Sequence, residues 1–347
     1  MASIVGEHVR TAARRRPVRQ HRYSVRYLAR RIGLALVTVV LAATLDFLLP
    51  RLAGGDPAQF LASTQALGSA KVARALEQQF GLQGSIWQQY VSFLGQLLHG
   101  NLGISYEFYP ESVASVLAGA IPYTVGLVLT ATVLSYLIGW VLGVIGAWRQ
   151  RSRFDELTVG VSFFLHGLPY FWTGMMLLFV FSFILGWFPD GHAFSVTDGD
   201  ESALAIIGDA IYHGTLPVAS LVITSIAGHL LIMRNNTVSV LREDYVMLAR
   251  AKGLPVWKLV FKYTARTAML PSFTGLMMSL GTVVGGAIVT EEVFSYPGVG
   301  LVTYNAILNH DYPLIQGAFL VIALVVIAMN LLADLLYPLL DPRVSSE

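Results

Sequence analysis

The sequence predicts an all-α polytopic membrane protein with six transmembrane helices. Of its 347 residues, 55% are hydrophobic and 13% are charged, and the mean hydropathy is +0.62. This composition is too apolar for an ordinary soluble domain. The apolar residues also gather into six segments, each near the roughly 20 residues that a helix needs to cross a bilayer. These segments lie at 32–53, 120–147, 157–188, 213–235, 271–294 and 314–338.

Lys and Arg are divided unevenly between the intervening loops. Nine arginines precede residue 32, and seven basic residues lie in 234–268. Because basic loops are retained in the cytoplasm, both termini and the loops 148–156 and 234–268 are predicted to be cytoplasmic. Acidic residues gather on the opposite side, in the loop before residue 213.

The first 31 residues form an Arg-rich extension that is too charged and too interrupted by Pro17 to build a core. We expect this extension to be disordered or to lie on anionic lipid. A signal peptide is the alternative, because charge precedes an apolar run. The run 32–53 is longer than a signal sequence and ends without a clean cleavage site, which favours a retained first span.

The long segment 54–118 is predicted to form a small external subdomain between the first two spans. Apolar residues recur with helical spacing from Trp87 to Leu98, and Gly100 ends the pattern. This segment is followed by 119–340, which contains the other five spans, and by a short tail at 341–347.

The polar interval 241–271 separates the fourth and fifth spans and is predicted to hold two short helices. In the first helix, the residues predicted to share the apolar face are Leu241, Tyr245, Leu248 and Ala249. Gly253 is expected to end it, and Pro255 to begin the second helix. Lys258, Lys262 and Arg266 form a basic stripe on the second helix, and Pro271 is expected to open the next span.

Several motifs in order resemble the membrane subunits of ABC importers, most closely the dipeptide/oligopeptide permeases. They include the small residues Ala249, Ala251 and Gly253 of the cytoplasmic loop, together with GGDPA at 54–58, GNLG at 100–103, GLPYFW at 167–172 and EVFSYPGVG at 292–300. The resemblance covers nearly everything from Tyr27 to Val344. It implies a type I ABC importer fold in a bacterial cytoplasmic membrane, with the loop 241–271 as the coupling helix region.

The same resemblance implies partners and a coupling site. A homologous second permease, two cytosolic ATPases that bind ATP and Mg²⁺, an external binding protein and membrane lipid are expected, and nucleic acid is not. The residues expected to meet the ATPase are Glu243, Asp244, Tyr245, Leu248, Ala249, Ala251, Lys252 and Gly253.

Polar or aromatic residues inside the predicted spans are the candidates for a substrate path. Such polar side chains are costly in hydrocarbon unless they face a cavity or a partner. The candidates are Asp46, His166, Tyr170, Trp172 and His229. For the two histidines an interhelical hydrogen bond is an equally good explanation, and for the aromatic residues packing is the alternative. Arg234 and Asp334 are expected to snorkel or to pair with each other.

The sequence carries no catalytic motif of the common kinds. No Gly-Lys dipeptide occurs, so a P-loop is excluded, and neither HExxH nor GxSxG is present. Cysteine is absent, which excludes thiolate chemistry and cysteine metal sites. The resemblance to the dipeptide/oligopeptide permeases implies a non-catalytic importer subunit for short peptides, without a cofactor of its own. An oligosaccharide importer is the alternative, and a passive channel and an intramembrane enzyme are remote ones.

Overall fold

The computed structural model describes residues 25–53, 85–195 and 202–340. The Arg-rich residues 1–24, the first part of the predicted external subdomain (54–84), the loop residues 196–201 and the tail 341–347 lie outside this part of the chain. The described residues are mainly helical and contain no β-strand, only an isolated bridge between Ile104 and Ser112. The predicted all-α class is confirmed at this level.

Among the described residues, four continuous helices are long and apolar enough to cross a bilayer. They are α1 (Val25–Ala53), α5 (Val113–Trp148), α8 (Ala203–Val240) and α12 (Tyr312–Leu340). A fifth crossing is possible if the bent pair formed by α6 (Arg153–His166) and α7 (Tyr170–Leu177) with its continuation η1 (Leu178–Ile184) counts as one span. The protein is thus a multi-pass membrane protein.

The bend in this pair occurs where Pro169 interrupts the predicted third span. The two halves meet at an angle of 101°. Pro169 has an extended backbone (φ −64°, ψ 142°) and stands at the N-cap of α7. Proline has no N–H to donate and disfavours a helical residue before it, so a helix boundary at this point follows from local chemistry.

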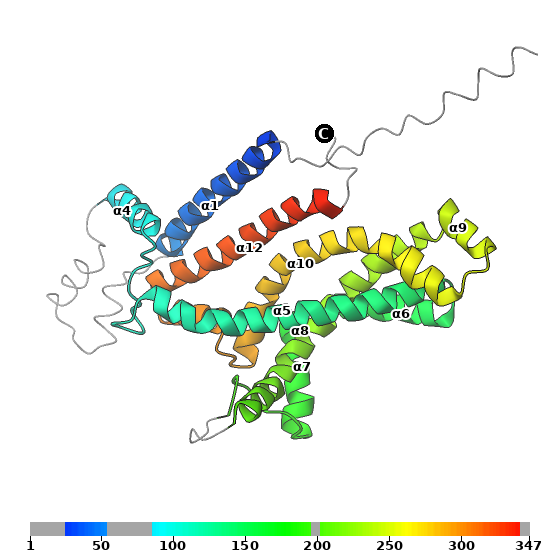
Figure 1. Cartoon of the computed structure of the whole chain (residues 1–347). Helices are drawn as coiled ribbons and strands as arrows, with labels where there is room; N and C mark the ends of the chain where they lie inside the picture. Colours follow the sequence, from blue (N-terminus) through cyan, green and yellow to red (C-terminus); the bar gives the residue numbers. More distant parts are fainter. Residues whose placement is uncertain (1–24, 54–84, 196–201, 341–347) are drawn as a thin grey trace, which may run out of the picture.

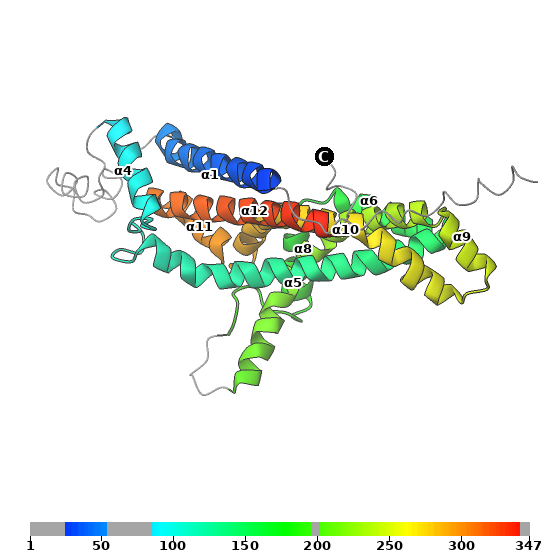
Figure 2. The same ribbon diagram turned by 45° about the horizontal axis from the view of Figure 1, so that its top comes forward.

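The remaining helices complete a bundle whose two ends differ (Figures 1 and 2). α4 (Ile86–Leu98) lies at one end beside α1, and α9 (Asp244–Ala251) lies at the opposite end. α10 (Arg266–Val293) packs against α8, α12 and α5, and it is preceded by the π-helical turn η2 (Lys258–Ala265). The short helix α11 (Val299–Leu308) packs against α10, α12 and α5.

Pro271 does not open the fifth span, as the sequence suggested, but lies inside α10. The chain is already helical from Val256 onwards, first as the wider π-helical turn η2 and then as α10. Wide turns of this kind are one of the ways by which a helix accommodates a local irregularity. The boundary of α10 therefore precedes the proline by five residues.

α5 and α8 pack closely against each other. A Cβ added at Gly139 would lie 2.9 Å from the His229 Cβ, and one added at Gly143 would lie 2.7 Å from the Leu230 carbonyl oxygen. Glycines four residues apart let two membrane helices approach until their backbones nearly touch. α5 and α8 are thus held together along the half of α5 that leads to the α9 end.

The opposite end is fastened by the buried carboxylate of Asp311. Its Oδ2 accepts hydrogen bonds from the Ser105 hydroxyl and from the backbone N–H groups of Tyr106 and Glu107, while its Oδ1 accepts from the Leu314 N–H. One side chain therefore caps the start of α12 and holds the segment before α5 against it.

Candidate coupling site and transport path

The predicted cytoplasmic loop contains the expected short helix, α9, at the end of the bundle (Figure 1). Glu243 precedes its first turn, and the helix ends at Ala251. Gly253 follows with φ +72°, a conformation that glycine adopts without steric cost. The predicted role of Gly253 as a helix stop is confirmed.

The buried face of α9 differs from the prediction. Val246 (1% exposed) and Ala249 (5%) point inward, whereas Tyr245 (41%) and Leu248 (56%) are exposed. A helix of two turns offers few inward positions, and residues three apart lie on one face. Val246 and Ala249 take these positions and pack against the buried Leu259 of η2.

The outward face of α9 therefore carries an apolar and charged surface. Tyr245, Met247 and Leu248 are exposed large apolar side chains on it, and Tyr245 donates a hydrogen bond from its hydroxyl to the Thr267 Oγ1. The other predicted coupling residues on this loop are also exposed: Glu243, Asp244, Ala251, Lys252 and Gly253. Ala249, by contrast, is buried in the chain itself and is not available to a partner.

The second helix of the loop begins beside Pro255 rather than on it. The Pro255 carbonyl oxygen accepts hydrogen bonds from the N–H groups of Lys258 and Leu259, so the proline stands just before the helix. Val256, the residue after the proline, is exposed.

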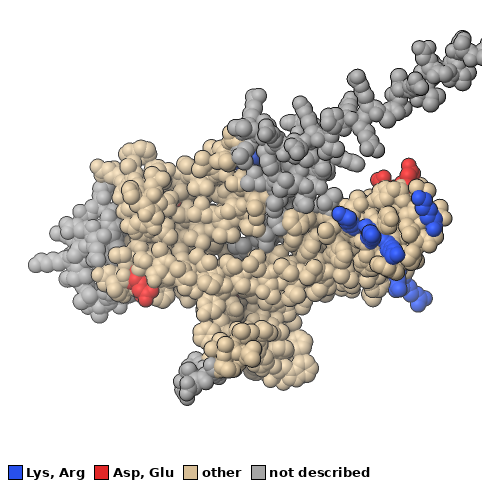
Figure 3. All heavy atoms as spheres, in the orientation of Figure 1, with Lys and Arg blue, Asp and Glu red and all other residues tan. Residues whose placement is uncertain are grey.

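Basic side chains gather at this end of the molecule. In Figure 3 the Lys and Arg atoms lie mostly over the α9 end. The exposed basic residues of the two predicted cytoplasmic loops are Arg149, Arg151, Arg153, Arg242, Arg250, Lys252, Lys258, Lys262 and Arg266. This distribution agrees with the prediction that both loops are cytoplasmic.

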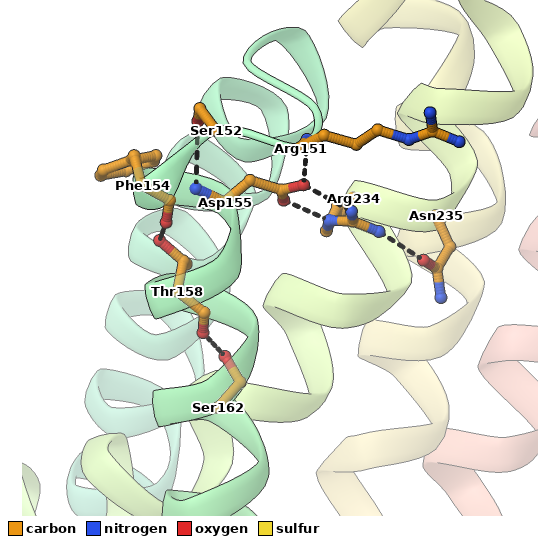
Figure 4. Close-up of polar contacts among 8 residues, drawn as sticks. All are labelled: Arg151, Ser152, Phe154, Asp155, Thr158, Ser162, Arg234 and Asn235. Atoms are coloured by element: carbon orange, nitrogen blue, oxygen red, sulfur yellow. Dashed lines mark hydrogen bonds and ion pairs between the residues drawn. The ribbon is translucent and has the colours of Figure 1, made fainter.

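A partly buried ion pair joins α6 to α8 near the same end (Figure 4). Arg234 donates from Nε to the Asp155 Oδ1 at 2.6 Å and from Nη2 to Oδ2 at 2.7 Å, and the Arg151 N–H donates to Oδ2 at 3.0 Å. Asp155 lies in the first turn of α6. Arg234 was expected to snorkel or to pair with Asp334; it pairs instead with Asp155, and the side chain of Asp334 lies outside the described residues.

Asp155 lies 79 residues before Arg234, and its sequence position marks it as an ordinary loop acid. Sequence reasoning had one usable signal, a Ser-x-x-Asp start of a helix. Ser152 does cap α6, accepting from the Asp155 N–H.

The candidates for a substrate path do not converge on one place among the described residues. Asp46 is 5% exposed, and neither of its carboxylate oxygens has a hydrogen-bond partner among the residues that the structure describes. The next residue, Phe47, packs against Tyr90 and Phe93 of α4. His229 is buried between α5 and α8, where its ring meets Tyr136 edge-on at 5.6 Å.

The remaining three candidates lie around the bend between α6 and α7. His166 is the exposed last residue of α6. Trp172 is 40% exposed, whereas Tyr170 is half-buried beside the α5–α8 core and its hydroxyl lies 3.5 Å from the Ser225 hydroxyl. His166, Tyr170 and Trp172 thus flank the bend in the chain, whereas Asp46 and His229 lie on other helices.

Comparison with known proteins identifies one family over most of the chain. Residues 139–346 match the family described as binding-protein-dependent transport system inner membrane component. The di/tripeptide transport system permease DppB of Pseudomonas aeruginosa (strain UCBPP-PA14) is 35% identical over 336 residues, covering 92% of this chain and 99% of that protein.

Two further relatives have similar coverage. The dipeptide transport system permease DppB of Escherichia coli K12 is 32% identical, covering 92% of this chain and 98% of the relative. The oligopeptide transport system permease AppB of Bacillus subtilis 168 is 31% identical with the same coverage. The chain belongs to the family of binding-protein-dependent transport system inner membrane components.

Proposed function

We propose that this chain is a permease subunit of an ATP-driven importer that brings short peptides into the cell. Relatives at 31–36% identity over 92% of the chain are named as peptide permeases, which supports the peptide substrate. The observation that carries the coupling role is α9, a short helix whose outward face exposes Tyr245, Met247 and Leu248 at the basic end.

The proposed machine has four further parts. A homologous permease pairs with this chain, two cytosolic ATPases bind ATP and Mg²⁺ below it, and an external protein delivers the peptide. The proposed topology has six spans, with α10 as the fifth and with both termini in the cytoplasm. Closure of the ATPases then moves α9 and tilts α8 and α10, which switches the access of the path from outside to inside.

The bend at 167–169 is the proposed place where the peptide passes. Broken helices are tolerated in a membrane where they line protein or a water-filled cavity. Trp172 and its neighbour Phe171 are exposed on this chain, so they are free to meet a peptide or the second permease. His229 lies in a helix interface instead, and we assign it a packing role.

The test uses the complex reconstituted in lipid with its ATPases and binding protein. A Cβ at Gly253 would meet nothing of the described chain within 4 Å, so the ring of Gly253→Trp would fill space where a partner would sit, in addition to straining the backbone at φ +72°. Gly253→Asn is the control, because asparagine tolerates the positive φ. We expect binding protein loaded with a dipeptide to stimulate ATP hydrolysis in the native and Asn complexes but not in the Trp complex.

Two results would count against the proposal. If dipeptide-loaded binding protein leaves ATP hydrolysis unchanged in the native complex, the importer function is wrong. If stimulation survives in the Trp complex, the loop is a linker and the coupling contact lies elsewhere.

A further inference from the structure

Trp148, the last residue of α5, packs into two apolar clusters at once. One cluster lies inside the bundle around Val144, Met233 and Val260, and the other joins α9 to η2 around Val246, Ala249 and Leu259. Trp148 and Val240 border both clusters. The indole therefore connects the helix that faces the proposed ATPase to the interior of the bundle.

Arg250 of α9 adds a second contact to the same ring. Its guanidinium carbon lies 5.3 Å from the centroid of the Trp148 ring, within the range of a cation–π interaction. α9 thus holds Trp148 both through its buried residues and through a cation above the ring.

A displacement of Trp148 would not stop at the end of α5. The Gly139 and Gly143 contacts leave no room between α5 and α8, and interfaces packed this closely move as one piece rather than deform. The Asp155–Arg234 ion pair joins the start of α6 to the same part of α8.

We infer that Trp148 is a positioning residue through which α9 moves α5, the second predicted span, together with α8. The inference rests on the proposed function and extends it. The resemblance of the loop alone implies movement of α8 and α10, the spans on either side of α9, and the inference adds α5. In this arrangement α5, α8 and the start of α6 move as one rigid unit, and the ATPases move this unit through their contact with α9.

The experiment compares two tryptophans on the same helix in the reconstituted complex. Trp148→Ala removes the ring that borders both clusters, whereas Trp140→Ala removes a ring that packs only in the inner cluster and near Phe261. Trp148→Phe keeps an aromatic ring and serves as the rescue. We expect Trp148→Ala to lose stimulation by loaded binding protein at an unchanged basal ATPase rate, and Trp140→Ala and Trp148→Phe to retain most of it.

Arg250 supplies a variant that cannot fail by unfolding the core, because its side chain is exposed. We expect Arg250→Gln to lower the stimulation about two- to fivefold, the effect of one exposed cation–π contact, and Arg250→Lys to lower it less. In the Trp148→Ala background, Arg250→Gln should have no further effect, because the ring it contacts is gone.

The chain has no cysteine, so two introduced cysteines can carry spin labels without further changes. Met247 on α9 and Ile138 on α5 are exposed positions. In the native background the distance between labels there should stay the same with and without ATP, and in Trp148→Ala it should change.

Each contrary outcome has its own meaning. Stimulation that survives Trp148→Ala, or that Trp140→Ala abolishes equally, overturns the inference while the importer remains. A label distance that changes with ATP in the native background also overturns it. A native complex without any stimulation overturns the proposed function, and the inference falls with it.

Discussion

Replacing Gly143 by alanine should destabilise the bundle, although alanine is the better helix former. The added Cβ would lie 2.7 Å from the Leu230 carbonyl oxygen, 3.0 Å from the Arg234 backbone nitrogen and 3.0 Å from the Met233 Cβ. Two of these atoms belong to the backbone of α8, so no side-chain rotation relieves the contact. α5 and α8 must separate locally instead.

The size of the effect follows from two opposing contributions. Overpacking a well-packed interior costs about 1–3 kcal/mol, and the backbone contacts place this site near the upper value. Glycine to alanine inside a helix gains about 0.5–1 kcal/mol. Gly143→Ala should therefore lower the free energy of unfolding by about 2 kcal/mol.

Gly126 and Gly119 on the same helix provide matched controls. A Cβ at either position would meet nothing within 4 Å, so only the helix gain applies, and these variants should be equal to or more stable than the native chain. The assay is unfolding of the purified chain by sodium dodecyl sulfate in mixed micelles, followed by circular dichroism. If Gly143→Ala is as stable as Gly126→Ala, the close approach of α5 and α8 is wrong.

Two other predictions concern the polar contacts at the two ends of the bundle. Asp155→Asn or Arg234→Gln should each lower the free energy of unfolding by about 2–4 kcal/mol in the same assay, because removal of one partner leaves a largely buried charge. The double variant should lose less stability than the sum of the two single variants. Strict additivity of the two losses would argue against the pair. Asp311→Ala should free the segment around Ser105, which would appear as faster hydrogen exchange at the Tyr106 amide, with the exchange of α9 amides unchanged. Equal exchange at Tyr106 in both proteins would show that the carboxylate does not hold the segment.

Features that depend on local chemistry could be predicted from the sequence. The apolar runs place α5, α8 and α12, because the cost of exposing or burying a segment of about 20 residues is decided by its own composition. The helix boundary beside Pro169 and the turn at Gly253 also follow from single residues, one without an N–H and one without a Cβ.

Features that depend on contacts between segments far apart in the sequence could not be predicted from the sequence. Periodicity gave α9 an inward face with Tyr245 and Leu248, but the position of Leu259 in three dimensions selects Val246 and Ala249 instead. The partner of Arg234 is likewise set by the crossing of α6 and α8, which no spacing in the sequence reveals.

The most direct test of the coupling role is to ask what touches α9 in the assembled complex. A photo-crosslinking amino acid at Leu248, which is 56% exposed on α9, should capture an ATPase subunit and give one discrete heavier band. The same group at Val37, which is 57% exposed on α1, should not capture it. If the label at Leu248 captures no ATPase subunit in a complex that hydrolyses ATP, α9 is not the coupling contact, and the account built on it is wrong.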